Sequence, residues 1–477
     1  MISDNVNGNL ISTARFEAWA EGTLAQLATA LQTPDLTLGH LEELLQAQAA
    51  RLMLPILRAA AQKLADRQPF CCPHCQTPLR LHEAGRGRHL DVVFGSMPLT
   101  RDYGWCPKCR TYHAPADQAL GLQAKAPASP KVQEIAALLS VRGPYHAGAE
   151  DARRLSGLEF SAASLHREAQ RQGQRALQLR QQDVERSKTM AGVAELSARS
   201  GTQHLAPFTL IIQMDAWNIR ERDHWGETQA LRKQQLDTQR WHWVFTGTLF
   251  RLDQRGETAG QRRVITQRGY VATRQSLESF THQIYTEALL RGLLHAQTVL
   301  ILGDGAIWIW NLADSRFRGA KQRVDLFHVK EHLHELARTL YGADTPQAQA
   351  WLKPLLHYLD QRKDGALDVL EHLQGLQTTL QQMTDTQKAD LEREVGYFTT
   401  HRQRMDYKAG RKLGEPVGSG VVESTARQYQ SRFKCTGQFW TPEGDETLLA
   451  LATLKRNERW HLLYPHSLRA SAVENAN

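Results

Sequence analysis

Two apolar stretches that each end in an aspartate decide the fold of the central part of this chain. They are Phe208-Thr-Leu-Ile-Ile-Gln-Met-Asp215 and Thr298-Val-Leu-Ile-Leu-Gly-Asp304, the second followed by Gly305. Short runs rich in aliphatic and β-branched residues predict buried strands. A lone aspartate after a strand is usually a turn residue. Two aspartates at the ends of adjacent strands would lie a few ångströms apart, and like charges that close need a cation between them.

The residues around these stretches predict an α/β domain interrupted by helices. Strands are expected at Phe208–Met214, Trp241–Leu252, Arg263–Thr273 and Thr298–Gly303, with a helix at about 275–294. Residues 325–405 show helical periodicity and few strand signals. Asp223 and Asp314 are weaker candidates than Asp215 and Asp304, because neither follows an apolar strand.

Glu423 is the third acidic candidate. It lies in the segment 418–427, GSGVVESTAR, where a glycine turn leads into a helix and the glutamate falls in the first turn. Two plainer interpretations stay open, an acid favoured by the helix dipole and a partner for Arg427 one turn later.

A basic face is expected on the helix that follows Glu423. Arg427, Arg432 and Lys434 would line this face and contact DNA. Trp440 or Trp460 would then be available to stack on an exposed base, although a tryptophan in the core is the more common arrangement.

Five of the six cysteines lie within 39 residues, and four of them form the pairs Cys72-Pro-His-Cys75 and Cys106-Pro-Lys-Cys109. A Cys-x-x-Cys turn presents two thiolates from one tight loop, and zinc prefers four such ligands in a tetrahedron. The segment between the pairs is long enough for a hairpin of His89–Phe94 against Met97–Trp105. This pattern predicts a zinc ribbon holding one structural Zn²⁺. Two unrelated buried cysteine pairs and a redox site are the alternatives.

A helix-turn-helix is predicted downstream of the ribbon. Ala149–Gly157 forms the first helix, Leu158–Phe160 the turn and Ser161–Gly173 the second helix, with Ser161 as its N-cap. Leu155 and Leu165 are expected to pack inward. The residues left to reach bases or phosphates in a major groove are Ser164, His166, Arg167 and Arg171. A plain helical hairpin would have the same loop, so that alternative stays open.

Composition sets the broad class. The net charge is +8 and the pI is near 9.2, which weakly favours a polyanionic partner. No run of 18 apolar residues suggests a membrane span, and the first ten residues, MISDNVNGNL, lack the features of a secretory signal. A cytoplasmic location, at the bacterial nucleoid, is therefore expected.

Five segments together resemble DDE-type transposases of bacterial insertion sequences, closest to the ISKra type within the group related to Mutator elements. The segments are QMDAW (213–217), ILGDGAIWIWN (301–311), DLFHVKEHL (325–333), GSGVVESTARQYQSRFK (418–434) and GQFW (437–440). The resemblance covers roughly 205–460. It implies an RNase H-like catalytic domain in which Asp215, Asp304 and Glu423 are the catalytic acids. Asp325 and His328 match the Asp-x-x-His signature that opens a helical insertion before the glutamate.

The resemblance also implies a reaction and its partners. The three acids would hold two Mg²⁺ ions that activate water against a backbone phosphorus and stabilise the leaving 3′ oxygen, and the freed 3′-OH would then attack target DNA. Partners would be double-stranded DNA, as terminal inverted repeats and as target, and a second copy of the chain in a homodimer or higher oligomer.

The expected architecture is a multidomain α+β protein. Its parts are N-terminal helices (1–68), a zinc ribbon (69–126), a helix-turn-helix region (127–205), the first part of the RNase H-like domain (206–324), an all-helical insertion (325–410) and the last part of the catalytic domain with a tail (411–477).

Two rival functions remain from the sequence. The stretch His328-Val-Lys-Glu331-His332 matches HxxEH, the inverted zinc-protease motif. A zinc metalloprotease would leave the ribbon, the helix-turn-helix and the two strand-end aspartates unexplained. The other rival is a catalytically inactive or repurposed transposase descendant that binds DNA without cleaving it.

Overall fold

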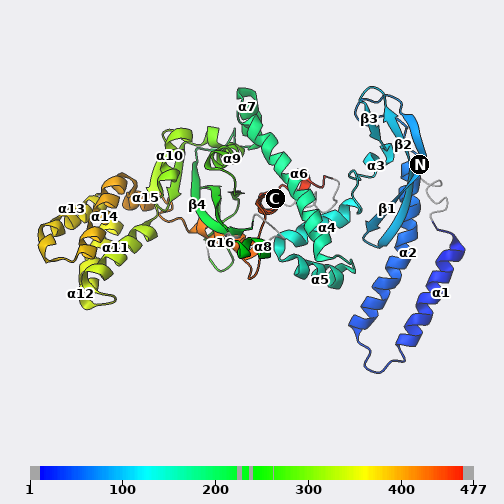
Figure 1. The fold of residues 1–477 in the computed structure, drawn as a ribbon, viewed down its shortest axis with the longest axis horizontal. Helices are drawn as coiled ribbons and strands as arrows, with labels where there is room; N and C mark the ends of the chain where they lie inside the picture. The colour runs from blue at the N-terminus through cyan, green and yellow to red at the C-terminus, as the bar shows by residue number, and fades with distance from the viewer. Residues whose placement is uncertain (1–10, 223–227, 236–239, 262, 466–477) are drawn as a thin grey trace. The chain divides into compact units, whose positions relative to one another are not determined.

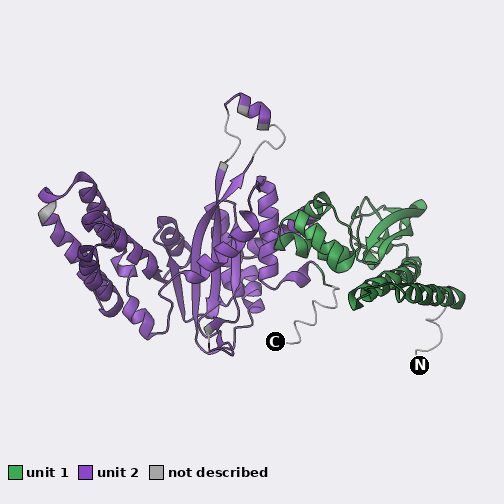
Figure 2. Cartoon of the chain, turned by 90° about the horizontal axis from the view of Figure 1, so that it is seen from below, with its two compact units in different colours: residues 1–168, 464–477 green, residues 169–463 purple. Residues whose placement is uncertain are grey.

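A computed structural model describes residues 11–222, 228–235, 240–261 and 263–465, so Asp223 and the first ten residues lie outside the described part. The chain forms two compact units, which Figure 2 distinguishes by colour. The first contains the described residues up to Glu168 with Tyr464 and Pro465, and the second contains Ala169–Leu463. No described helix combines the length and the apolar character that a membrane span requires.

The first unit begins with two helices, α1 (Thr13–Ala30) and α2 (Leu38–Asp66). Ser12 and Thr37 cap them by accepting hydrogen bonds from backbone N–H groups of the first turn, as serine and threonine commonly do. The Trp19 indole donates to the Gln48 carbonyl at 2.9 Å and joins the two helices. The helical prediction for 1–68 is confirmed over its described part.

A three-stranded antiparallel sheet follows in the order β1 (Arg80–Val92), β2 (Gly95–Cys106), β3 (Thr111–His113). The predicted hairpin is confirmed, because His89 pairs with Pro98 and Val92 with Gly95 across the β1–β2 turn. Buried side chains of β1 and β2 pack on α2: Leu90, Val92, Met97 and Leu99 against Ala61 and Ala65. The short helix α3 (Pro115–Ala119) adds Ala116 to this core.

The predicted helix-turn-helix is present in shape. Helix α4 (Pro130–Arg142) precedes α5 (Tyr145–Ser156), and α6 (Ala162–Arg186) is longer than predicted. Gly157 ends α5 in the left-handed conformation, with φ of 65°. Leu165 is fully buried as predicted, and it lies against Gly148 of α5.

Leu155 corrects the prediction, because its side chain is 78% exposed. The buried face of α5 passes through Gly148 and Ala152. Leu155 lies in the last turn of α5, two residues before Gly157, and the packing that buries Gly148 and Ala152 does not cover its side chain.

The second unit is built on a mixed five-stranded sheet with the order β10-β9-β4-β5-β8. Figure 1 labels β4, the middle strand of this order. Strands β4 (Thr209–Glu221), β9 (Thr298–Gly303) and β10 (Lys321–Val324) are parallel to one another. Strands β5 (Arg240–Arg251) and β8 (Gly269–Thr273) complete the sheet through antiparallel pairs with β4 and with each other. If the five strands are numbered in chain order, the sheet read from β8 to β10 has the order third, second, first, fourth, fifth.

The predicted strand Arg263–Thr273 is wrong as a single element. Its first part is β7 (Arg263–Ile265), which pairs only with β6 (Arg255–Glu257) in a separate two-stranded hairpin, and its second part is β8. Gly269 begins β8, and a Cβ added there would meet the Glu287 carboxylate at 2.7 Å, so close packing selects glycine.

Helices cover the sheet. They are α9 (Leu277–Leu290), α10 (Ile307–Arg316), α16 (Gly420–Phe433) and α17 (Pro442–Arg456), with α7 (Met190–Arg199) packed on α9 and the short α8 (Thr228–Lys233) before β5. Between β10 and α16 the chain is helical, as predicted: α11 (Leu326–Tyr341), α12 (Pro346–Gln361), α13 (Gly365–Leu376), α14 (Asp385–His401) and α15 (Tyr407–Lys412). Figure 1 shows α11 to α14 grouped as a bundle beside the sheet.

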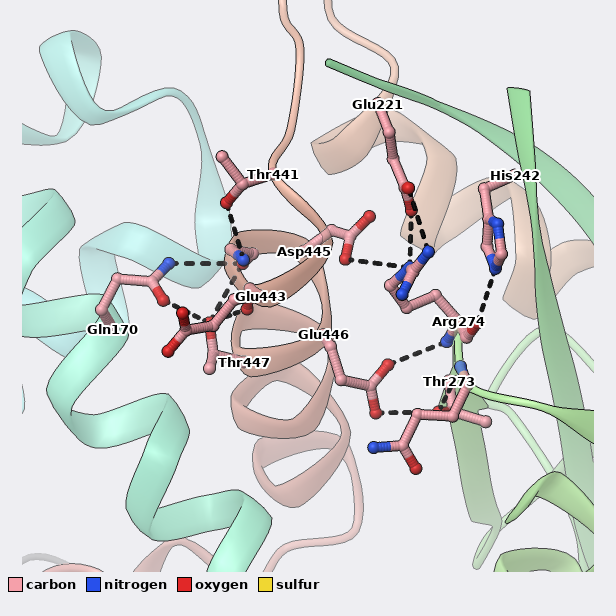
Figure 3. A network of polar contacts seen from close by, with 12 residues as sticks. Gln170, Glu221, His242, Thr273, Arg274, Thr441, Glu443, Asp445, Glu446 and Thr447 are labelled. Carbon is pink, nitrogen blue, oxygen red and sulfur yellow. Dashed lines mark hydrogen bonds and ion pairs between the residues drawn. The ribbon is translucent and has the colours of Figure 1, made fainter. Parts of the chain in front are cut away.

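A buried polar network joins α17 to the sheet edge (Figure 3). Arg274, which follows β8, donates to both carboxylate oxygens of Glu221 at 2.6 and 3.0 Å, and its backbone N–H donates to Glu446. Asp445 is fully buried, with only the Arg274 guanidinium 3.7 Å away. Burial and the neighbouring Glu221 carboxylate raise the pKa of Asp445 to about 9, so this acid is neutral near pH 7 and can donate a proton toward Glu221.

Replacing Asp445 with asparagine is expected to change how stability depends on pH. Because the folded-state pKa of about 9 exceeds the ordinary pKa of 3.8 for an aspartate side chain, the wild type loses stability as pH rises through this range. The Asp445→Asn variant lacks this loss, so its stability relative to wild type should grow with pH by up to about 1.4 kcal/mol per unit. Urea unfolding between pH 5 and pH 9 measures the trend, and a difference that is constant across pH would contradict it.

Candidate active site and zinc centre

The register of two parallel strands places Asp215 and Asp304 side by side. In β4 and β9, Gln213 is paired with Leu302, and each aspartate lies two residues further along its own strand direction. Neighbouring strands are about 4.8 Å apart, so the two aspartates are level on adjacent strands. The prediction that the two strands are adjacent is confirmed.

The prediction that Asp215 ends its strand is wrong. β4 continues to Glu221, paired with β5 throughout. It is β9 that ends, at Gly303, so β4 loses its parallel neighbour beside Asp215. This leaves one side of Asp215 open to a ligand. Asp314 lies elsewhere, on α10, where its carboxylate accepts a hydrogen bond from Gln322.

Glu423 lies in the first turn of α16, as predicted, and Gln213 holds that helix against the sheet. The buried Gln213 amide donates to the Gly418 carbonyl at 3.2 Å and accepts from the Val422 N–H at 3.1 Å. Because side chains alternate along a strand, Gln213 and Asp215 project from the same face of β4. The strand that presents Asp215 therefore also anchors the turn that presents Glu423.

Asp325 links the start of the helical insertion to its end. It is fully buried and caps α11 by accepting from the N–H groups of Phe327 and His328 at 2.5 and 3.1 Å. Its second oxygen accepts from the Ser419 N–H and lies 2.5 Å from the Ser419 hydroxyl. The same hydroxyl is 2.8 Å from Glu423. Ser419 has one proton, so it can donate to one of the two carboxylates at a time.

The acids interact electrostatically as one group. Burial, followed by the charges of Asp304 and Glu423, raises the pKa of Asp215 to about 6, above its ordinary value of 3.8. The backbone N–H of Ala216 opposes this shift, as does the nearby His328 imidazole. His328 is therefore near the acids, as predicted, although its Nδ1 also lies 3.1 Å from Glu331. Within the described residues, neither Asp215 nor Asp304 has an ion-pair partner.

Among the described residues, only four cysteines form a close group of side chains that could hold a metal ion without a further ligand, and the three acids do not form such a group.

The HxxEH motif does not form a compact ligand group in the described structure. His332 Nδ1 lies 2.8 Å from the buried Glu394, whereas His328 is beside Glu331 and near Asp215. The two histidines therefore have separate partners. Nothing in this geometry favours a metalloprotease.

The four predicted zinc ligands lie together. Cys72 and Cys106 are fully buried, and Sγ distances are 3.8 Å for Cys72–Cys109 and 3.5 Å for Cys75–Cys106. A tetrahedral Zn²⁺ with bonds of about 2.3 Å would place its sulfurs about 3.8 Å apart, so the four thiols fit one zinc ion.

The two cysteine turns have the same backbone form. In each, the residue after the second cysteine has positive φ, 60° at Gln76 and 55° at Arg110. Its N–H donates to the carbonyl of the first cysteine of the turn, Cys72 or Cys106, at 2.9 and 2.8 Å. Matched turns of this kind present all four sulfurs to a single point.

The residues predicted to bind DNA fall into two groups. His166, Arg167, Arg427 and Lys434 are exposed on α6 and around the end of α16, whereas Arg171 is half-buried. The Ser164 hydroxyl is engaged in a reciprocal cap with Ser161, at 2.8 to 3.0 Å, and is less available to a base.

Arg432 and Trp440 are corrections, because their exposed fractions are only 3% and 5%. The Arg432 guanidinium lies 5.2 Å from the Trp440 ring, and the indole donates to the Phe433 carbonyl. Five helical positions turn a side chain by about 140°, so Arg427 and Arg432 cannot share one face of α16.

Comparison with known proteins adds little to this geometry. No family model matches the chain. A segment of 71 residues is 35% identical to a UPF0236 protein in the vanSb 3′ region of Streptococcus gallolyticus. The match covers 15% of this chain and 16% of that protein. It is too short to show a family.

Proposed function

We propose that this chain is a DNA transposase of the DDE class, which cleaves and joins DNA strands with two divalent metal ions. The observation that carries the proposal is the grouping of Asp215, Asp304 and Glu423. They come from two adjacent parallel strands and a helix anchored to one of them, and the two aspartates have no ion-pair partner among the described residues. Acids that share a site in this way need cations to be charged together.

The fold supports an RNase H-like assignment of the catalytic domain. The five-stranded sheet has its first strand between the second and the fourth, so the acids of the first and fourth strands are neighbours. The helical segment α11–α15 lies between β10 and α16, where the resemblance to ISKra-type transposases expects an insertion. Asp325 and Ser419 close the base of that insertion, which brings Glu423 back to the sheet.

Each residue has a definable part in the proposed reaction. Mg²⁺ ions bound here would supply an activated water and charge stabilisation at the scissile phosphate. Asp215 and Asp304 would provide oxygen ligands from fixed strands, and Glu423 would provide another from α16. Gln213 and Asp325 would orient the Glu423 helix without touching DNA. Gly305 has φ of 110°, a backbone conformation beside Asp304 that favours glycine.

Cleavage of DNA by the purified full-length chain tests the proposal. Two substrates, supercoiled plasmid and a duplex that carries a terminal inverted repeat, should be nicked in Mg²⁺ or Mn²⁺ and left intact in EDTA. The products should carry 3′-OH ends, because the proposed chemistry leaves the 3′ oxygen free for strand transfer. Absence of metal-dependent nicking on both substrates would leave the DNA-binding rival as the better explanation.

Binding to duplex DNA is expected to depend on α6. Arg167→Ala should weaken binding and lower the slope of log affinity against log salt by about one, because one phosphate contact is lost. Arg154→Ala is a matched control: its side chain is 68% exposed on α5 but paired with Glu150. Fluorescence anisotropy with a duplex that carries a terminal inverted repeat, at several salt concentrations, measures the affinity of both variants for DNA. Equal affinity and slope for Arg167→Ala and wild type would refute this role.

A further inference from the structure

The phenol ring of Tyr397 lies beside the loop that carries Asp304. Tyr397 is on α14, and its ring stacks on His332 with centroids 4.0 Å apart and planes 16° apart. His401 contacts the ring at 4.9 Å. His332 is fixed in turn by the buried Glu394, at 2.8 Å. The ring is therefore held in one orientation by neighbours on α11 and α14.

The hydroxyl of Tyr397 points at the Asp304–Gly305 loop. A Cβ added to Gly305 would lie 3.1 Å from this hydroxyl. The loop is itself held in place, because the Ala306 N–H donates to Asp304 at 3.0 Å and the Trp310 indole donates to the Gly305 carbonyl at 3.1 Å. Both the tyrosine and the backbone that it approaches are thus fixed.

This hydroxyl is buried and has no hydrogen-bond partner in the described structure. A buried hydroxyl without a partner is destabilising, and phenylalanine would fill the same space without that cost. Burial and the Asp304 charge raise the pKa of Tyr397 above its ordinary value, so the group stays protonated and is a donor. The Tyr397 hydroxyl is near the Asp304 carboxylate but makes no hydrogen bond to it. An oxygen atom of a ligand bound at Asp304 could accept a hydrogen bond from this hydroxyl.

We propose that the Tyr397 hydroxyl donates a hydrogen bond to an oxygen ligand bound at Asp304, from a hydrated divalent cation or from a DNA phosphate. This inference rests on the proposed function and adds a ligand-binding residue from the helical insertion to the three acids. It gives the insertion a direct part in the site, through the Tyr397 hydroxyl. The Tyr397 hydroxyl, which has no hydrogen-bond partner in the described structure, would then gain an acceptor when the ligand binds.

The test compares Tyr397→Phe with wild type in the full-length chain. Mn²⁺ affinity without DNA, measured by electron paramagnetic resonance of free Mn²⁺, tests the cation as the oxygen source. The KM for plasmid nicking tests the phosphate. Tyr341→Phe is the matched control, since it removes a hydroxyl from the same insertion at a tyrosine whose pKa only burial perturbs. Asp304→Asn identifies which part of the Mn²⁺ binding belongs to this site.

Loss of one hydrogen bond should lower Mn²⁺ affinity, or raise the KM for DNA, by about tenfold. The midpoint of thermal unfolding should be unchanged or higher, because an unpaired hydroxyl has been removed. The proposal would be overturned if Tyr397→Phe left both the Mn²⁺ affinity and the KM for DNA unchanged, or if this variant unfolded. If wild type binds Mn²⁺ through Asp304 yet nicks no DNA, the cleavage proposal fails while the Mn²⁺ affinity still decides the role of Tyr397. If it does neither, both proposals fail.

Discussion

We expect Asp304→Asn to abolish metal-dependent strand cleavage while leaving the fold and DNA binding intact. The change keeps the shape of the side chain and removes a charged oxygen ligand, so bound metal ions would be lost or misplaced at the scissile phosphate. Metal ions contribute several kcal/mol of transition-state stabilisation, which corresponds to a loss of about 10³-fold or more in rate. The same result is expected for Asp215→Asn and Glu423→Gln.

Stability separates this result from simple unfolding. Burial, with a further contribution from the charges of Asp304 and Glu423, raises the pKa of Asp215 to about 6, so removing one of these charges should not destabilise the metal-free protein. Asp314→Asn is the matched control, because Asp314 is an exposed acid on α10 bonded to Gln322. Single-turnover nicking and thermal unfolding are measured for all four variants. Full cleavage by any one of the three site variants removes that residue from the site.

The pH profile of the wild type should carry the signature of Asp215. Its folded pKa of about 6 means that protons compete with metal ions below that pH. Cleavage at low Mg²⁺ should therefore fall as pH drops through about 6, and higher Mg²⁺ should move the fall to lower pH.

We expect Cys106→Ala to abolish zinc binding at the four clustered cysteines and to unfold the ribbon. Structural zinc contributes about 10–16 kcal/mol of apparent binding free energy in small zinc domains, far more than the packing of a short three-stranded sheet replaces. The expected zinc content falls from one ion per chain to none, and the amides of 70–113 lose protection from hydrogen exchange. The second unit should keep its protection, since its core lies in the strands and helices of 169–463.

Cys71→Ala is the control for this experiment. Cys71 is the immediate neighbour of Cys72 but is not one of the four clustered thiols. The Cys71→Ala variant should therefore retain one zinc ion per chain. Retention of full zinc and full protection by Cys106→Ala would contradict a four-cysteine site.

The four cysteines could be predicted from the sequence because a paired Cys-x-x-Cys is a short-range signal, and the structure brings them together. Asp215 and Asp304 also stand out locally, since each follows an apolar run of the sequence. The residues that position these groups had no such signal. Gln213 and Ser419 are about 200 residues apart in sequence, and they act through contacts that depend on strand register and on the closure of the insertion. Only the three-dimensional arrangement shows them.

The differences between prediction and structure have identifiable physical causes. Arg432 is five residues after Arg427, so its side chain is turned by about 140° to the buried side of α16. Leu155 is exposed because it lies in the last turn of α5. Asp215 was placed at a strand end because the apolar run stops there. The strand itself continues, since β5 supplies backbone partners up to Glu221 whatever the side chains are.

The closure of the insertion by Asp325 and Ser419 has a consequence for biosynthesis. Strands β4 and β9, with both aspartates, leave the ribosome long before α16, because Glu423 follows Asp304 by 119 residues. The contact of Ser419 with Asp325, beside Glu423, spans 94 residues of sequence. Long-range contacts of this kind form late in folding. A nascent or truncated chain therefore holds two acids without the third, and the complete acidic triad arises only when translation has passed α16.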